Sequence, residues 1–240
     1  VGSFFLFRIE PAPLGFDWVF IPGSRRERNT MERFWEHSWK RVDPERVAGY
    51  VRSIDIEPDA LIAALHRHGV KTVCDAGCGC GAYALKLAAN GFSVCGFDVS
   101  SRAVEIAQAL LEKAALAAEL KTAGILSTGY ADGTFDGVVC RDVLDHLPRA
   151  EAAAAVKELC RITKPVGIVI FTLDPLDEEY RTEPHRVNAD GDYVYTAGKW
   201  KGMVFHPYTA ETVRTVIPVG TLCEITDTSG ELTVLLKNAE

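Results

Sequence analysis

The stretch VCDAGCGCGAYALKLA, residues 73–88, runs from a short apolar segment through a glycine-rich turn into a segment with helical character. Asp75 stands at the end of the apolar run, and Gly77 and Gly79 follow at two-residue spacing. Such a turn lets a ligand approach the backbone closely and offers free N–H groups to an anion. The stretch therefore predicts a ligand-binding turn at the end of a buried strand.

The turn also carries Cys78 and Cys80, which raises the question of a metal or redox site. A C-x-C spacing does not match structural zinc sites, which use C-x₂₋₄-C with further ligands elsewhere. The chain has seven cysteines, an odd number, and they are scattered through apolar segments. This pattern is typical of reduced, buried thiols and favours a cytoplasmic protein. We expect the two cysteines to contribute backbone N–H groups and no metal ligand.

Around this turn, helix-like and strand-like segments alternate from residue 58 to residue 173. Strands are expected at 71–77, 92–100, 121–126, 135–141 and 167–173, and helices at 58–69, 82–91, 101–120 and 150–163. Alternation of this kind is typical of a parallel sheet with crossover helices. A helix at 210–217 and a hairpin at 221–238, with Ser229 and Gly230 at its turn, are expected to close the chain. The fold class is α/β, with a doubly wound sheet.

The chain divides into three expected parts. Residues 1–30 show no sustained period, and we interpret them as an irregular segment upstream of a natural start at Met31. Residues 31–57 have helical character and form an N-terminal lid. Residues 58–240 form the main domain, with an insertion at about 174–207 that is polar, aromatic and too long for an ordinary connection. A hairpin is expected within it at 188–192.

Composition limits the classes of partner. The net charge of −7 argues against nucleic acid, which normally selects a basic face. No apolar run reaches the roughly 20 residues that a membrane helix needs. We therefore expect a protein with no nucleic-acid and no membrane partner, acting as a monomer or homodimer.

The turn alone does not distinguish two cofactors. Gly77, Gly79 and Ala82 formally satisfy the dinucleotide fingerprint, and Asp98 lies at the distance expected for a ribose diol. Asp75 breaks the tie, because its carboxylate would repel a pyrophosphate. The methionine end of S-adenosylmethionine is a zwitterion next to a cationic sulfur, so its ammonium suits Asp75 and its carboxylate suits the helix N-terminus.

Three segments in order then resemble the class I S-adenosylmethionine-dependent methyltransferases: VCDAGCGCG, VCGFDVS and FDGVVCRDVLDHL. The resemblance covers residues 58–175 and implies a Rossmann-like, seven-stranded, mostly parallel sheet whose C-terminal strand is antiparallel. It also implies S-adenosylmethionine as cofactor. The implied cofactor-binding residues are Asp75, Ala76, Gly77, Cys78, Gly79, Asp98, Val99, Ile125, Leu126 and Arg141.

The sequence departs from that family in two places. The segment AGILSTG, residues 123–129, offers no acid for the adenine amino group, so backbone groups at Ile125 or Leu126 must serve. In KPVG, residues 164–167, Val166 replaces a glycine of the family's pattern. A β-branched residue does not easily adopt a positive φ, so we expect that turn to avoid one.

The segment RDVLDH, residues 141–146, follows a strand at the ligand-binding edge. Asp142, Asp145 and His146 have the spacing of one helical face and resemble the corresponding residues of ubiquinone-pathway O-methyltransferases, where the same pattern is similar to a divalent-metal site. His146 and Asp142 are the candidate catalytic residues, as general bases. The alternative, which we favour over a metal site, is that the acids complement a helix dipole.

Aromatic residues outside these motifs are candidates for the acceptor pocket. Trp35 and Trp39 lie one turn apart on the expected lid helix, with His37 between them. His206 and Tyr208 follow the insertion. Each of these residues has an alternative interpretation as ordinary packing.

These observations predict methyl transfer from S-adenosylmethionine to a small-molecule acceptor, at an oxygen, nitrogen or carbon atom. Three alternatives stay open: a nicotinamide-dependent oxidoreductase, an enzyme that uses the sulfonium cofactor for another reaction, and a non-catalytic S-adenosylmethionine-binding domain.

Overall fold

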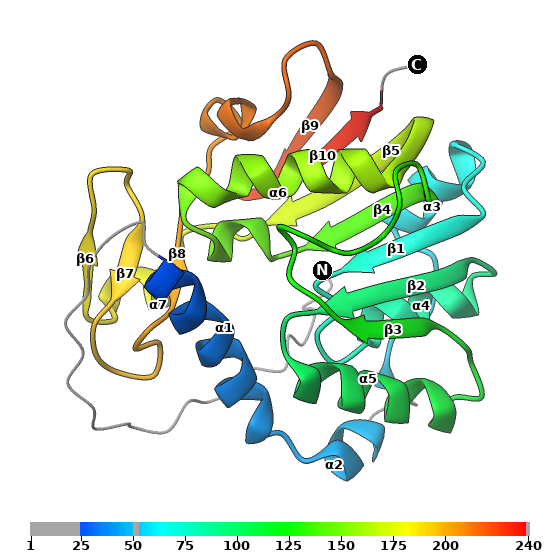
Figure 1. Ribbon diagram of the computed structural model, residues 1–240, viewed down its shortest axis with the longest axis horizontal. Coiled ribbons are helices and arrows are strands. Elements are labelled where there is room, and N and C mark those ends of the chain that lie inside the picture. The colour runs from blue at the N-terminus through cyan, green and yellow to red at the C-terminus, as the bar shows by residue number, and fades with distance from the viewer. Residues whose placement is uncertain (1–24, 50–52, 239–240) are drawn as a thin grey trace.

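A computed structural model describes residues 25–49 and 53–238. Its main feature is a seven-stranded sheet with the order β3-β2-β1-β4-β5-β10-β9, in which β10 is antiparallel to both neighbours (Figure 1). The strands are β1 (Thr72–Ala76), β2 (Ser93–Asp98), β3 (Glu119–Thr122), β4 (Phe135–Arg141), β5 (Thr163–Leu173), β9 (Leu222–Thr228) and β10 (Glu231–Lys237). The predicted fold class, a mostly parallel α/β sheet with an antiparallel C-terminal strand, is confirmed.

Helices cover both faces of this sheet because its central strands alternate their side chains between two cores. Cys74 and Val138 point to one face, which packs against α6 (Arg149–Ile162) and the short helix η3 (Thr212–Val216). Val73 and Val139 point to the other face, which packs against α3 (Ala60–Arg67) and α4 (Ala82–Ala89). A third helix, α5 (Ser101–Lys113), buries Ile106 and Leu110 beside α4. The sheet is therefore doubly wound, as expected.

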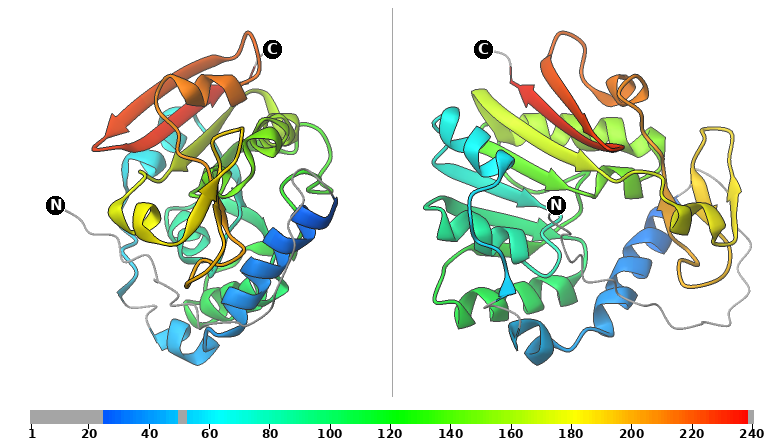
Figure 2. Two further views of the ribbon diagram at one scale, coloured as in Figure 1. Left: turned by 90° about the vertical axis from the view of Figure 1, so that its left-hand side faces the viewer. Right: turned by 180° about the vertical axis from the view of Figure 1, so that it is seen from behind.

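The insertion forms a small second sheet, β6 (His185–Val187), β7 (Tyr193–Tyr195) and β8 (Val204–Phe205), preceded by α7 (Glu178–Thr182). The expected hairpin at 188–192 joins β6 to β7. Helix α1 (Arg25–Lys40) lies beside this sheet, as both views of Figure 2 show. Met31 of α1 packs on Val194 and Val204, and α2 (Pro44–Gly49) then leads toward α5. The N-terminal helix and the insertion thus form one layer over one edge of the main sheet.

The helical boundaries differ from the sequence expectations in three places. Helix α1 begins at Arg25, before Met31, while residues 1–24 lie outside the described residues, so most of the prediction for 1–30 is not addressed. Helix α5 ends at Lys113, short of the expected residue 120, because Ala115 adopts a φ of 54° and the chain then extends to form edge strand β3. The helix expected at 210–217 is a 3₁₀ helix.

Val166 contradicts a prediction directly. Its φ is 57°, so the turn in KPVG keeps the left-handed conformation that the sequence argument excluded. The side chain is 53% exposed, which removes any packing cost, but the β-branched residue still strains the backbone.

Among the described helices, none combines the length and apolar character required to cross a membrane.

Candidate active site

The candidate site is a cavity of about 820 Å³ at the carboxyl edge of the parallel strands. Segments that follow β1, β2, β3, β4 and β5 line it, and one face of α1 and part of the insertion close it. This is the edge at which open α/β sheets bind ligands, where the chain order reverses between β1 and β4. The volume is that of a site for small molecules.

The glycine turn after β1 forms the floor of the cavity. Gly77 has a φ of 77°, and a Cβ added to it would lie 2.5 Å from Cγ2 of Val143. Gly79 has a φ of 51°, and an added Cβ would lie 3.2 Å from the ring of Trp39. Positive φ favours glycine at both positions, and at Gly77 an added Cβ would also force Val143 to move. Cys78 also lines the cavity, whereas Ala76, predicted with it, is fully buried and does not.

Asp75 is the last polar residue before this turn, and it is 2% exposed. Its Oδ2 atom has no hydrogen-bond partner, although the residue lines the cavity. Burial raises the pKa of Asp75 to about 7, the nearby Arg141 guanidinium lowers it, and the carboxyl of Asp98 raises it further. Oδ2 therefore lacks a donor, and the Arg141 guanidinium offsets only part of the cost of burying the carboxylate.

Asp98, at the end of β2, is also buried but is held by the backbone. Its Oδ2 accepts a hydrogen bond from the N–H of Gly79 at 2.9 Å, and its Oδ1 accepts one from the N–H of Ser100 at 2.9 Å. Burial raises the pKa of Asp98 to about 6, while these hydrogen bonds lower it. The contacts fix the carboxyl group beside the glycine turn, where it lines the cavity.

The loop after β3 supplies the opposite wall. Ile125 and Leu126 of this loop line the cavity, together with Ala123 and Ser127, and so does Val99, which follows β2. An isolated β-bridge between Gly124 and Ser127 shapes the loop. The loop residues that line the cavity include no acid, and contact of the adenine with backbone groups at Ile125 or Leu126 stays a prediction.

The cysteines of the turn carry no metal set. All seven cysteines are free, and the one metal-like cluster among the described residues contains no cysteine. Burial raises the pKa of Cys78 well above its ordinary value, so its thiol stays protonated.

The residues after β4 depart from the predicted helical face. Asp142 has a φ of 53°, and its Oδ1 accepts a hydrogen bond from Oγ1 of Thr172 at 2.5 Å. Asp142 does not belong to the cluster in which polar atoms of Asp145, His146 and Asp174 lie within 4.8 Å of one another, although its charge raises the pKa of Asp145 and Asp174. The predicted trio Asp142, Asp145 and His146 is not assembled; its third member is Asp174, which follows β5.

Burial dominates the electrostatics of this cluster. It raises the pKa of Asp145 to about 8 and that of Asp174 to about 7, and it lowers the pKa of His146. Oδ2 of Asp145 accepts a hydrogen bond from the N–H of Asp174 at 3.0 Å, whereas its Oδ1 has no partner. His146 and Asp174 line the cavity, whereas Asp145 is buried beside them and does not line it.

The predicted acceptor residues separate into two groups. Trp35 and Trp39 line the cavity on the inner face of α1. His37 lies on the exposed face, where its Nε2 is 2.8 Å from Arg41. His206 is buried against Oδ1 of Asp192, at 2.8 Å, with Tyr208 beside it, and neither lines the cavity. Of the residues predicted for the acceptor pocket, His37, His206 and Tyr208 therefore do not line this cavity.

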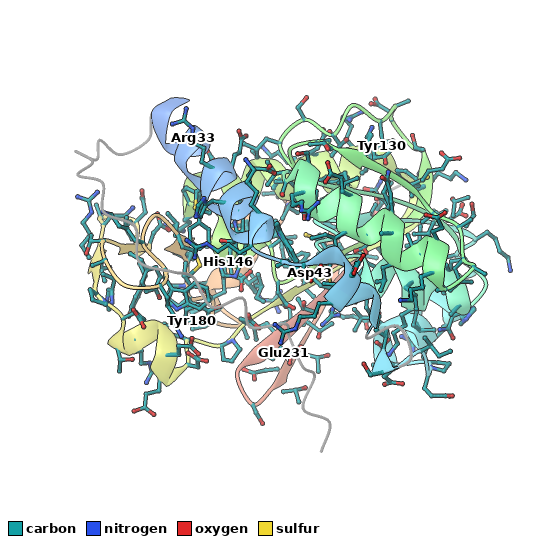
Figure 3. All side chains as sticks on the ribbon, turned by 90° about the horizontal axis from the view of Figure 1, so that it is seen from below. Arg33, Asp43, Tyr130, His146, Tyr180 and Glu231 are labelled. Atoms are coloured by element: carbon teal, nitrogen blue, oxygen red, sulfur yellow. The ribbon has the colours of Figure 1, made fainter. Side chains whose placement is uncertain are left out.

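The segment after β5 adds Asp174 and Tyr180, which sequence reasoning missed, and it also adds Trp200. Figure 3 shows His146 and Tyr180 on the side of the molecule where α1 meets the insertion. The aromatic rings of Trp35 and Tyr180 lie 5.1 and 6.2 Å from that of His146, and Trp200 lies 6.0 Å from Tyr180. Only Asp174 had a local signal, since it ends a strand at the same edge as Asp75 and Asp98.

Comparisons with known proteins agree with this geometry. Residues 73–167 match the family of methyltransferase domains. A magnesium-protoporphyrin O-methyltransferase of Synechocystis sp. is 32% identical over 123 residues, 51% of this chain and 53% of that protein. A ubiquinone biosynthesis O-methyltransferase of Paraburkholderia xenovorans is 36% identical over 104 residues, 42% of this chain and 44% of that protein. The chain thus spans about half the length of the curated relatives it matches.

Solved structures share the fold at lower identity. The magnesium protoporphyrin IX methyltransferase of Synechocystis with bound S-adenosylmethionine superposes with a TM-score of 0.59 at 20% identity, over 92% of this chain and 100% of that one. An S-adenosylmethionine-dependent methyltransferase of Clostridium acetobutylicum gives a TM-score of 0.61 at 12% identity, over 90% and 100%. Residues 73–167 therefore match a methyltransferase domain, and the chain has the fold of these S-adenosylmethionine-dependent methyltransferases.

Proposed function

We propose that the protein is an S-adenosylmethionine-dependent methyltransferase that acts on a small molecule. The observation that carries this proposal is the buried, unpartnered Oδ2 of Asp75 beside a glycine turn at a helix N-terminus. A cation is needed to compensate that carboxylate, and an anion is needed at the turn. The ammonium and carboxylate of one amino-acid group meet both needs, whereas a pyrophosphate meets only the second.

The residues present fit this cofactor. Asp75 would hold the ammonium, the turn at Gly77 and Gly79 the carboxylate, and Asp98 the ribose hydroxyls. The apolar wall at Ile125 and Leu126 would cover the adenine. When bound, S-adenosylmethionine supplies a methyl group activated by a cationic sulfur.

The chain's own residues contribute alignment and proton transfer. Trp35 and Trp39 line the side of the cavity formed by α1, where they would exclude water and orient the acceptor. His146 is neutral near neutral pH because burial lowers its pKa, and it lines the cavity, so it can accept a proton from the acceptor. Asp142 is a weaker base candidate because its Oδ1 is already bonded to Thr172.

The setting of the enzyme belongs to the same proposal. The net charge of −7 supports a small molecule over a nucleic acid as acceptor. Seven free cysteines support a reducing cytoplasm. We propose a monomer or homodimer.

The test is a binding comparison followed by a turnover assay. Calorimetry should detect binding of S-adenosylmethionine and S-adenosylhomocysteine but not of NADH. The protein incubated with S-adenosylmethionine and a mixture of metabolite extracts should form S-adenosylhomocysteine. Binding of NADH in place of S-adenosylmethionine would support an oxidoreductase and overturn the proposal. If the protein binds S-adenosylmethionine but forms no S-adenosylhomocysteine with any extract, the result would favour a non-catalytic domain.

A further inference from the structure

The half of the cavity next to the insertion has a chemistry of its own. Its walls are aromatic, formed by Trp35, His146, Tyr180 and Trp200, which follow one another at ring separations of 5.1 to 6.2 Å. The carboxyl of Asp174 belongs to this wall, since its oxygen clusters with the ring nitrogen of His146. Aromatic faces and a carboxylate together form an environment that favours a cation.

Positive charge within the protein does not reach Asp174. Among the cavity-lining residues that the structure describes, Arg141 is the one lysine or arginine, and it lies over the ring of Tyr83 and 3.7 Å from Asp142. Lys199 pairs with Glu179 and lies over the ring of Trp200, with its Nζ atom 5.2 Å from the ring centroid, so it supplies a cation to one part of the aromatic wall. Within the described part of the chain, no lysine or arginine forms an ion pair with Asp174.

A second observation points to a missing ligand group. His146 is 7% exposed, lines the cavity, and has no hydrogen-bond partner for Nδ1. The carboxyl groups of Asp145 and Asp174 lie beside the same ring. A bound cation would favour the ionised form of these carboxyls, whereas an anionic acceptor would be repelled by any of them that is ionised.

We infer that the acceptor of the proposed methyl transfer is an amine, bound as its ammonium between the Asp174 carboxylate and the aromatic wall of Trp35, Tyr180 and Trp200. The inference rests on the proposed function and narrows its acceptor class. The ammonium must first give one proton to a carboxylate or to His146. The nitrogen lone pair then forms the bond to the methyl carbon while the carbon–sulfur bond breaks and leaves its electron pair on sulfur.

The test uses three small probes of one shape and different charge: benzylammonium, benzyl alcohol and benzoate. Each is titrated by calorimetry into the protein saturated with S-adenosylhomocysteine. We expect benzylammonium to bind about tenfold more tightly than benzyl alcohol, since one ion contact and one cation–π contact distinguish them, and benzoate to bind most weakly.

Variants locate the effect. Asp174→Asn should remove the preference for benzylammonium and leave benzyl alcohol binding unchanged. Asp190→Asn, which removes the same charge from an exposed loop of the insertion, is the matched control and should keep the preference. The inference is overturned if benzyl alcohol or benzoate binds as tightly as benzylammonium, if no probe binds, or if Asp174→Asn keeps the preference. Failure of the proposed function is distinct, because S-adenosylhomocysteine itself would then not bind.

Discussion

The two ends of the central strands carry buried or half-buried aspartates in opposite states. At the amino end, Asp136 of β4 accepts hydrogen bonds from the N–H groups of Lys71 and Thr72 and from Oγ1 of Thr72, and it pairs with Lys164 at 2.8 Å. Burial raises the pKa of this carboxyl, but Lys164 and these donors hold it well below its usual range. At the carboxyl end, burial raises the pKa of Asp75 to about 7, and its Oδ2 has no partner.

The contrast separates a structural acid from a ligand-binding one. Asp136 ties three neighbouring strands together and stabilises the fold. Asp75 destabilises the fold when it is charged, because Arg141 and one backbone hydrogen bond offset only part of the cost of its burial. Such a group is retained where a ligand supplies the missing partner, which identifies the carboxyl end as the binding edge.

The largest expected effect comes from Asp75→Asn. It should weaken S-adenosylmethionine binding by about a hundredfold, since a charged hydrogen bond to the ammonium is lost. It should also stabilise the ligand-free protein by about 2 kcal/mol at a pH of about 8, because the burial of a charge is removed. Calorimetry and thermal unfolding measure the two effects. Equal binding by the variant would contradict the assignment.

Asp136→Ala should show the opposite pattern. It leaves two N–H groups and a hydroxyl without their acceptor, so the free energy of unfolding should fall by about 2 kcal/mol, or about 4–8 °C in Tm. Cofactor affinity of the folded protein should stay within about twofold. Asp132→Ala, which removes an exposed carboxylate paired with Arg161, is the control and should cost less than about 1 kcal/mol. If Asp136→Ala lost cofactor binding but kept its stability, Asp136 would be a ligand-binding acid and not a structural one, which would contradict the contrast between the two ends of the strands.

The pH dependence of stability should reveal the same contrast on a smaller scale. The pKa values of Asp75, Asp174 and Asp145 are raised by burial to about 7, 7 and 8, so the folded state holds more protons than the unfolded state between about pH 4 and these values. Stability therefore falls as pH rises through this window. The ligand-free protein should melt at a higher temperature near pH 6 than near pH 8, by a few degrees, and a flat or inverted profile would count against the raised values.

Glu36 of α1 lies at the same carboxyl end of the strands as Asp75, but its carboxylate has hydrogen-bond partners within the protein. It accepts a hydrogen bond from Oγ of Ser100 at 2.7 Å, at the N-terminus of α5, and this contact lowers its pKa. Glu36→Gln should loosen the attachment of α1 and weaken cofactor binding by only about threefold. Lys40→Met, which removes the exposed partner of Glu36 at 3.5 Å, should change affinity less still. An effect as large as that of Asp75→Asn would mean that the lid, not the buried acid, dominates binding.

The part of the site at the glycine turn could be predicted because its residues are close together in the sequence. Asp75, Gly77 and Asp98 lie within 24 consecutive residues of β1, the turn and β2, so spacing alone brings them to one edge. The parallel sheet with crossover helices followed from the alternation of elements, whereas the antiparallel C-terminal strand was implied by the family resemblance. Gly77 and Gly79 were identifiable from their spacing in the turn, and their positive φ and close neighbours explain why glycine stands there.

The part of the site next to the insertion depends on tertiary contacts that no local period encodes. Trp35 was predicted, but its partners Tyr180 and Trp200 come from an insertion more than 140 residues later. The left-handed φ of Asp142 breaks the helical spacing and lets Asp174 replace it in the cluster with His146. Val166 shows that residue type alone can also mispredict backbone conformation, because this valine adopts a positive φ that its residue type disfavours.

Proton release on cofactor binding tests the central claim most directly. If Asp75 is largely protonated in the free protein and ionised in the complex, calorimetry in buffers of different ionisation heat should show release of about 0.7 proton from Asp75 at a pH of about 6.5, falling to about 0.2 near pH 7.5. Asp98, with a pKa of about 6, adds a smaller release at the lower pH. Binding of S-adenosylmethionine with no proton release near pH 6.5 would contradict the account, because Asp75 would then be charged and compensated before the ligand arrives.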